Sequence, residues 1–315
     1  MYLIACNGNE HADEILSKPP YDKLTDSIKK FKGDAALYSR RGELLYQNNQ
    51  FPYAESDYKK AWTLQPNEEH AIDVAKVLIK KNQDSAITFI EKALIKIPES
   101  IVLQVSLAKG YQKRNQPEKA LAICNQVISK HPNQLDALIL KSEILQSLNK
   151  NDEALATLEK AYSYAPFDAE IAYDLAFEYA ESQNSKALVL ADSLIRMDSL
   201  KIHPEPYLLK GIYYYTKKNY DAALQQFNTA IKKDYNYLDA HMYKGEMFYD
   251  QKRYSDALKT FQLVINITPT YADAYFWMGK TLQAMGNKQE AKLNYQRAYG
   301  LDKSLTGAKE AADKL

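Results

Sequence analysis

The segment LDAHMYKGEMFYDQKRYSDALKTFQLVINITPTY, residues 238–271, contains the pattern that decides the fold. Apolar residues flank two small residues, Gly245 and Ala257, at helical spacing, and a polar turn at residues 250–253 separates the two runs. Pro269 follows the second run, and proline cannot continue a helix. The segment therefore predicts a helix, a tight turn and a second helix packed closely against the first.

The same pattern recurs along most of the chain, in two columns of small residues whose members are 32–36 residues apart. The first-helix column is Gly42, Ala75, Ala108, Ser142, Ala176, Gly211, Gly245 and Gly279. The second-helix column is Ala54, Ala86, Ala120, Ala154, Ala187, Ala223, Ala257 and Ala291. A closing proline stands at Pro66, Pro98, Pro132, Pro166 and Pro269. Small residues let two helices approach closely where they cross, and larger ones there would overpack the contact.

This pattern resembles the tetratricopeptide repeat (TPR), a unit of about 34 residues formed by a helix A and a helix B. Repeat seven matches with Gly245, Phe248, Tyr254, Ala257, Phe261 and Pro269; repeat one with Gly42, Ala54, Tyr58, Ala61 and Pro66; repeat eight with Gly279, Ala291, Tyr295 and Ala298. The resemblance implies an all-α fold, a right-handed superhelical solenoid of about eight TPR helix pairs with N- and C-terminal capping helices. It explains most of the 25 tyrosines as packing residues.

The repeats divide the chain into five expected parts. They are a lipobox-like N-terminus and polar tether (1–20), an N-terminal capping helix (21–34), repeats 1–5 (35–203), repeats 6–8 (204–303) and a C-terminal capping helix (304–315). Repeat two is short in its turn. The irregular stretch 198–206, with Pro204 and Pro206, is either a kink or linker between the two groups of repeats or a longer loop in one solenoid.

Both ends of a solenoid need a cap, because a terminal repeat exposes an apolar face. At the N-terminus we expect a helix over residues 22–31 that packs through Leu24, Ile28 and Phe31. At the C-terminus Ser304 is the expected N-cap of a helix over residues 306–314, whose packing face is Ala308, Ala311 and Ala312.

Composition and motifs argue against catalysis, cofactors and nucleic acid. Lys and Arg number 41 and Asp and Glu 40, so there is no basic surplus to neutralise phosphates. Nucleotide-binding and metalloprotease motifs are absent, and the five histidines are scattered. Cys124 falls in a helix B packing column and is expected to be a buried thiol. We therefore expect no catalytic residues, no metal site and no cofactor.

Leu3-Ile4-Ala5-Cys6 resembles a bacterial lipobox, whose cysteine carries the acyl chains that hold a lipoprotein to a membrane. Only five residues precede Cys6, whereas a secretory signal has a charged start and a longer apolar region. The motif thus implies lipidation of Cys6 if the true start lies upstream, and otherwise an ordinary frayed terminus. No apolar run is long enough for a membrane span.

In the TPR family helix A lines the concave groove, and this resemblance supplies the candidate site. Counting from the small column, the expected partner-binding positions are Tyr173, Phe177, Leu208, Ile212, Tyr215, Met242, Glu246, Tyr249, Phe276 and Lys280. The corresponding positions of repeats 1–4 include Ser39, Glu43, Lys76, Lys109 and Glu143, so the C-terminal part is the more apolar and aromatic. The other interpretation is that these aromatic residues only pack the fold. The Lys and Asn with which some family members clamp a peptide carboxylate are missing.

The sequence favours a non-catalytic scaffold or adaptor, lipid-anchored on the periplasmic side of a bacterial cell envelope, that binds proteins or peptide segments. A soluble cytoplasmic TPR adaptor is the alternative if Met1 is the genuine start. A glycan-binding uptake lipoprotein is a third hypothesis, but such proteins carry a large non-repeat ligand region, and the repeats leave no room for it.

Overall fold

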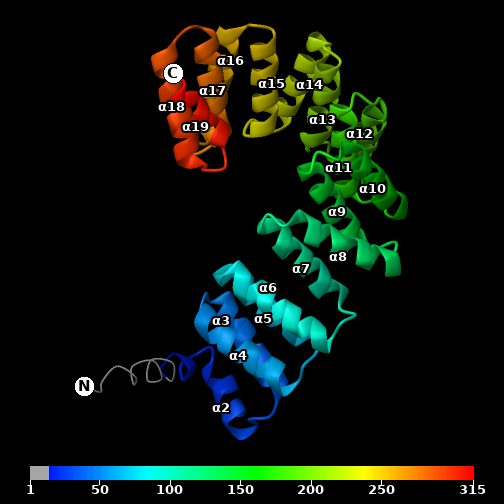
Figure 1. Ribbon diagram of the computed structural model, residues 1–315, viewed down its shortest axis with the longest axis vertical. Helices are drawn as coiled ribbons and strands as arrows, with labels where there is room; N and C mark the ends of the chain where they lie inside the picture. The colour runs from blue at the N-terminus through cyan, green and yellow to red at the C-terminus, as the bar shows by residue number, and fades with distance from the viewer. Residues whose placement is uncertain (1–13) are drawn as a thin grey trace, which may run out of the picture. The chain divides into compact units, whose positions relative to one another are not determined.

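The computed structural model of the protein describes residues 14–315, and every regular element in that range is a helix (Figure 1). The helices are α2 (Asp22–Lys30), α3 (Ala35–Gln47), α4 (Phe51–Leu64), α5 (Glu68–Lys81), α6 (Gln83–Lys96), α7 (Ile101–Lys113), α8 (Pro117–Lys130), α9 (Leu135–Ser147), α10 (Asn151–Tyr164), α11 (Ala169–Glu181), α12 (Lys186–Met197), α13 (Glu205–Thr216), α14 (Tyr220–Lys233), α15 (Leu238–Asp250), α16 (Tyr254–Ile267), α17 (Ala272–Ala284), α18 (Lys288–Leu301) and α19 (Thr306–Asp313). Helices α3 to α18 form the eight expected pairs, and the all-α prediction is confirmed.

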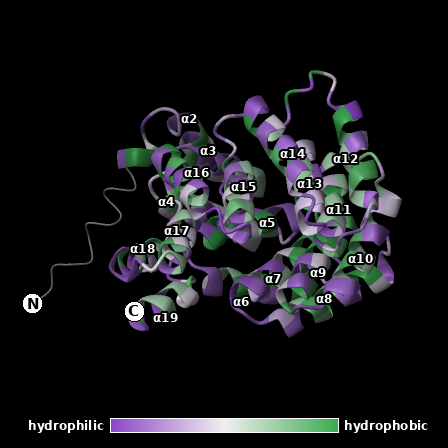
Figure 2. Ribbon diagram, turned by 90° about the horizontal axis from the view of Figure 1, so that it is seen from above, coloured by the Kyte–Doolittle hydropathy of each residue, from purple (hydrophilic) through white to green (hydrophobic). Residues whose placement is uncertain are grey.

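The helices belong to two compact units, one ending at Ala161 and the other beginning at Tyr162. Within each unit consecutive helices pack on one another, as α3 does on α4 and α17 on α18. The helices carry hydrophobic and hydrophilic residues side by side along their length (Figure 2), as expected when one face of a helix is buried and the other meets water. The five B helices that have a closing proline end two residues before it, as the proline column predicts.

The turn between the two helices of a pair repeats one backbone conformation. The seventh residue after the small residue of helix A has a positive φ in every repeat except the second: Asn49, Asn115, Asn149, Gln183, Lys218, Lys252 and Gly286. This left-handed conformation reverses the chain sharply, and Asn and Gly adopt it most readily. In repeat two Asn82 has an extended backbone and is both the C-cap of α5 and the N-cap of α6. This confirms the shortened turn.

A glycine occupies the helix A column wherever an aromatic ring of helix B faces it. A Cβ atom built on Gly245 would lie 2.4 Å from the ring of Phe261, closer than any real contact. The same pairing occurs as Gly42–Tyr58, Gly211–Phe227 and Gly279–Tyr295. Where the column holds Ala108 or Ser142, the residue at the same register of helix B is Cys124 or Leu158. The alanines of the second column are all fully buried.

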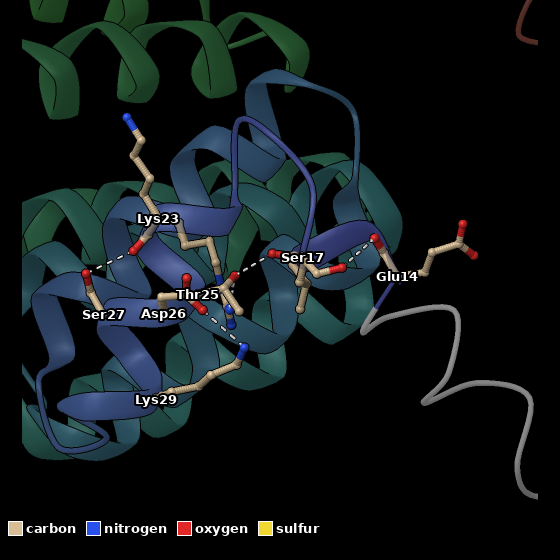
Figure 3. A network of polar contacts seen from close by, with 9 residues as sticks. Glu14, Ser17, Lys23, Thr25, Asp26, Ser27 and Lys29 are labelled. Atoms are coloured by element: carbon tan, nitrogen blue, oxygen red, sulfur yellow. Dashed lines mark hydrogen bonds and ion pairs between the residues drawn. The ribbon is translucent and has the colours of Figure 1, made fainter.

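A buried ion pair fastens the N-terminal cap to repeat one. The Arg41 guanidinium donates to both carboxylate oxygens of Asp57 at 2.7 Å and to the Thr25 hydroxyl at 2.9 Å. Thr25 in turn donates to the Leu16 carbonyl oxygen at 2.6 Å, so this one network links the segment before α2 with α2, α3 and α4. Figure 3 shows Thr25 at its centre, with further bonds inside the cap from Ser17 to Glu14, Ser27 to Lys23 and Lys29 to Asp26.

Both capping helices are confirmed, with two corrections. Ile28 is buried but Phe31 is 63% exposed, because α2 ends at Lys30 and Phe31 leaves the helical stripe; Tyr21 is buried instead. At the other end Ala308 and Ala312, both on α19, are buried.

Ser304 does not cap α19. The N-cap is Leu305, whose side chain has no hydrogen-bond acceptor. The backbone amide of Ser304 donates to the carboxylate of Asp302 at 2.8 Å.

The stretch between repeats five and six is a loop inside the second unit, from the end of α12 at Met197 to the start of α13 at Glu205. The carboxylate of Asp198 accepts a hydrogen bond from the backbone amide of His203 at 2.9 Å and closes this loop. Pro204 is the N-cap of α13 and Pro206 lies in its first turn, where a missing amide hydrogen costs no helical bond. The prolines therefore begin the next helix.

Substituting Gly245 by alanine should destabilise the second unit, because the added methyl group meets the buried ring of Phe261. We expect a loss of about 1–3 kcal/mol in the free energy of unfolding, measured by denaturant titration. Gly300→Ala is the matched control: Gly300 is also helical, nothing lies within 4 Å of its Cβ position, and alanine there should stabilise the helix slightly.

The damage from Gly245→Ala should appear by hydrogen exchange in α13 to α18, since repeats couple mainly to their neighbours. Exchange that rises equally along the whole chain, or equal destabilisation by both variants, would contradict this explanation.

Candidate functional site

All ten expected binding positions lie in the second unit, but three of them belong to its core. Leu208, Ile212 and Met242 are 1%, 0% and 5% exposed. They are buried because these aliphatic side chains pack between neighbouring helices of the unit. The prediction that they line an accessible groove is wrong, and the surface that remains is less apolar than the sequence suggested.

The other expected positions keep part of their surface exposed: Tyr173, Phe177, Tyr215, Glu246, Tyr249, Phe276 and Lys280. Three rings gather around the Lys280 ammonium, which lies 3.7 Å from the centre of Trp277, 5.4 Å from Tyr249 and 5.7 Å from Phe276. A cation over an aromatic face is attracted by the quadrupole of the ring. These rings thus already hold one positive charge, and Trp277 is a contributor that the sequence did not single out.

A single stripe of polar residues runs along α15. Asp239, Tyr243, Glu246 and Asp250 follow one another at steps of four, three and four residues, so they share one side of the helix. Of these only Glu246 was among the expected positions. The spacing in the sequence was a sufficient signal. The expected positions Met242 and Tyr249, however, each precede a member of the stripe by one residue, and Met242 is buried.

Neighbouring helices extend this stripe into a surface that we call the tyrosine–carboxylate face. Its members are Tyr173, Glu181, Tyr215, Tyr237, Asp239, Tyr243, Glu246, Asp250, Tyr271 and Asp273. The Tyr215 hydroxyl donates to Asp250 at 2.5 Å, and that of Tyr243 donates to Glu181 at 3.3 Å. Tyr237 is hydrogen bonded to Tyr173, and Tyr271 donates to Asp239. These bonds join α11, α13 and α15 and the residue that precedes α17.

Four carboxylates of this face, those of Glu181, Asp239, Glu246 and Asp273, are held in an environment that disfavours their charge. Partial removal of water raises the pKa values of Glu181, Asp239 and Asp273 above the usual range. The pKa of Glu246 rises to about 7, mainly through burial; Lys280 opposes the rise, and the charges of Asp250, Glu181 and Asp273 add to it. An incoming cation would relieve this crowding of negative charge.

Repeat one shows what Glu246 lacks. Glu43 takes the same position after the small column, and its carboxylate accepts from the Tyr58 hydroxyl at 2.7 Å and from the Lys76 ammonium at 3.1 Å. These hydrogen bonds, that of Tyr58 first, lower the pKa of Glu43. In repeat seven the ring is Phe261, which has no hydroxyl, and the lysine, Lys280, lies over Trp277. Among the described residues Glu246 has no hydrogen bond or ion pair.

The described residues contain neither a metal-holding cluster nor a reactive thiol. Residues 14–315 contain no group of three or more His, Cys, Asp or Glu arranged to hold a metal ion. Cys124 is buried, and burial raises the pKa of its thiol to about 11, so it is a packing residue as predicted. Cys6 lies outside the described residues. Within them, no helix is both long and apolar enough to cross a bilayer.

Comparison with known proteins identifies the repeats. Two family models described as tetratricopeptide repeat match residues 208–272 and 272–305, and the model of anaphase-promoting complex, cyclosome, subunit 3 matches residues 79–161. A TPR repeat-containing protein of Methanocaldococcus jannaschii is 34% identical over 91 residues, which cover 27% of this chain and 28% of that protein.

Solved structures show the same fold at low sequence identity. A tetratricopeptide repeat protein from Parabacteroides merdae has a TM-score of 0.68 at 19% identity, over 78% of this chain and 97% of its own. PilW, described as a type IV pilus biogenesis factor, has a TM-score of 0.51 at 19% identity, over 67% and 96%. Human IFIT1, solved with the capped RNA m7Gppp-AAAA, has a TM-score of 0.51 at 16% identity, over 84% and 68%.

Replacing Glu246 by glutamine should stabilise the protein at pH 8, because a carboxylate whose pKa is about 7 in the fold and 4.5 as a reference must ionise there at a cost. A raised pKa adds stability only below the unfolded value and loses it as pH rises through the folded one. The gain from Glu246→Gln should therefore grow from pH 5 to pH 8, to about 1–2 kcal/mol allowing for solvent screening.

Glu43→Gln is the matched control of opposite sign. The pKa of Glu43 is lowered, so its contribution is present above about pH 4.5 and is lost only as pH falls further. Thermal melting at several pH values measures both variants. If Glu246→Gln destabilises at pH 8, or both variants change stability in parallel, the electrostatic account of the face is wrong.

Proposed function

The chain belongs to the tetratricopeptide-repeat proteins, and we propose that it is a non-catalytic scaffold whose partner is held along helices α11, α13, α15 and α17. The TPR fold supports a role in protein–protein interaction. What supports this particular surface is the half-exposed aromatic cluster Tyr249, Phe276 and Trp277 beside the tyrosine–carboxylate face. Rings with little rotamer freedom are the usual anchors of protein interfaces.

A protein partner suits this face better than nucleic acid does. Its acidic side chains are carboxylates, which repel phosphate when ionised, and it has no basic member, whereas nucleic-acid interfaces are basic. IFIT1 was solved with RNA, but the likeness to it is one of fold alone. A glycan-binding uptake protein remains a weaker hypothesis, because helix pairs occupy residues 35–301 of the described chain and leave no separate ligand region there.

We further propose that the protein is attached through a lipid on Cys6 to the periplasmic side of a bacterial envelope, the polar segment after Cys6 serving as a tether. The support is the Leu3-Ile4-Ala5-Cys6 motif. A soluble cytoplasmic adaptor is the alternative, and it requires no change in the proposed binding surface.

Replacing Tyr249 and Phe276 together by alanine should weaken partner binding about tenfold or more, because the variant removes two of the three rings of the cluster. The measurement is the amount of partner retained from native membranes by the tagged protein. The matched control is Phe167→Ala with Tyr235→Ala, two rings of the same unit that are 85% and 58% exposed away from the cluster.

Melting and helicity must be followed in both ring variants. If the Tyr249 and Phe276 variant loses stability and binding in parallel, the rings are packing residues. If it keeps full affinity, or the control loses as much, the partner binds elsewhere.

Lipid attachment predicts that Cys6→Ser, introduced into the gene with its native upstream sequence, releases the protein from membranes into the soluble fraction. Two or more acyl chains hold a protein stably to a bilayer, and the variant would carry none of those on Cys6, so loss of this cysteine should be decisive. Fractionation followed by immunodetection measures this, and Cys124→Ser controls for loss of a thiol. Membrane association that survives in Cys6→Ser would contradict lipid attachment, and wild-type protein found in the soluble fraction would favour the cytoplasmic adaptor.

A further inference from the structure

A cavity of about 410 Å³ opens between α11, α12 and the start of α13, next to the tyrosine–carboxylate face. Leu194, Met197 and Pro206 contribute apolar walls, and Glu170 and Glu205 contribute carboxylates. An arginine or lysine side chain has the same division, since its aliphatic stem is apolar and its head is charged. The volume is within the range of pockets that hold small ligands or single large side chains.

One carboxylate oxygen of Glu205 has no donor in this cavity, although the side chain as a whole is 41% exposed. This Oε2 atom is buried without a hydrogen-bond partner, and Nδ1 of the exposed His203 is 3.7 Å away. Glu205 and Glu170 both lie in the first turn of a helix, where the helix dipole favours the ionised carboxylate. A guanidinium or ammonium group from a partner would supply the missing donors.

The cavity continues into the face electrostatically. Glu205 and Asp239 both contribute to raising the pKa values of Tyr173 and Tyr237, so these carboxylates lie close to the hydrogen-bonded tyrosine pair. Further along, Glu246 has no partner in the described chain, and Lys280 is engaged by the rings of the aromatic cluster. The second unit contains as many Lys and Arg as Asp and Glu, so the acidity belongs to this face rather than to the whole unit.

Resting on the function proposed above, we propose that the partner segment is basic: it lays arginine or lysine side chains along the tyrosine–carboxylate face and inserts one of them into the cavity at Glu170 and Glu205. The hydroxyls of Tyr215 and Tyr243 already donate to Asp250 and Glu181, and the rings are partly exposed, that of Tyr243 being stacked on Phe227 on one side. Guanidinium groups stack on aromatic rings of this kind. The contact of Lys280 with Trp277 is the intramolecular example of the same chemistry.

The first experiment measures binding of fluorescein-labelled peptides to the full chain by anisotropy. The probe consists of four Arg-Gly-Ser units, and the comparison peptides replace each arginine by glutamate or by glutamine. We expect the arginine peptide to bind about tenfold or more tightly than the glutamine peptide, and the glutamate peptide not to bind. Equal binding of the three peptides, or preference for the glutamate peptide, overturns the proposal.

Charge variants of matched size then locate the binding. The test variant is Glu170→Gln, Glu205→Gln and Glu246→Gln, which neutralises three carboxylates of the cavity and face. The control is Asp221→Asn, Glu310→Gln and Asp313→Asn, three exposed carboxylates on α14 and α19. We expect the test variant to lose about tenfold in affinity for the arginine peptide and the control less than about twofold. Equal losses would mean unspecific attraction and would overturn the proposal.

A third measurement separates this proposal from the proposed function. A photo-reactive phenylalanine analogue replaces Phe276 in the aromatic cluster beside the face or, as control, Leu293 on α18, which is 60% exposed. Cross-linking in native membranes and mass spectrometry identify the segment that is captured. A basic segment captured only from Phe276 supports both proposals. An acidic or apolar segment captured there overturns the proposal of a basic segment but keeps the proposed docking surface. Capture only from Leu293 overturns both proposals. Capture of a second copy of this chain through α18 does the same.

Discussion

The close crossing of helix A and helix B is the contact on which the rest of the structure depends. It requires that a ring such as Phe261 lie almost against the backbone of the facing helix, which only Gly245 permits. Because each pair is fixed internally in this way, neighbouring pairs can stack with a constant offset, and the exposed positions of successive A helices come side by side. The hydrogen bond from Ser39 to Asp73 and the ion pair of Lys76 with Glu43 show that register between repeats one and two.

That crossing also explains why the fold could be predicted from the sequence. Two columns of small residues place all eight helix pairs, and a closing proline marks the end of five of them, because helix crossings and helix ends set steric limits on the residue type. The ends were less predictable. Ser304 and Phe31 are chemically suited to the roles expected of them, but the backbone leaves the helix one residue away from where each would act. Boundary positions depend on local dihedral angles, which residue type constrains weakly.

The surface proposed for binding lies on the helices that the sequence indicated, but three of the expected side chains are buried. Helical periodicity gave α11, α13, α15 and α17, and it placed Glu246, Tyr249 and Lys280 on an accessible surface. It could not decide which of two adjacent stripes is buried, because Met242 and Tyr243 are both compatible with core or surface. The sequence also assigned most tyrosines to packing alone. Tyr58 packs as expected, whereas the hydroxyls of Tyr215 and Tyr243 donate hydrogen bonds to carboxylates at the surface.

Glu246 connects the packing of repeat seven with the proposed binding surface. The fold could have satisfied this carboxylate as repeat one satisfies Glu43, with a tyrosine hydroxyl and a lysine of the next repeat. Repeat seven instead has Phe261, whose ring still fills the space over Gly245, so packing is unchanged while the hydrogen-bond donor is lost. An unpaired, partly buried carboxylate lowers the stability of the free protein and is satisfied only when a donor arrives from outside. The same residue thus weakens the isolated chain and would strengthen a complex, which is the arrangement expected where a surface serves binding rather than folding.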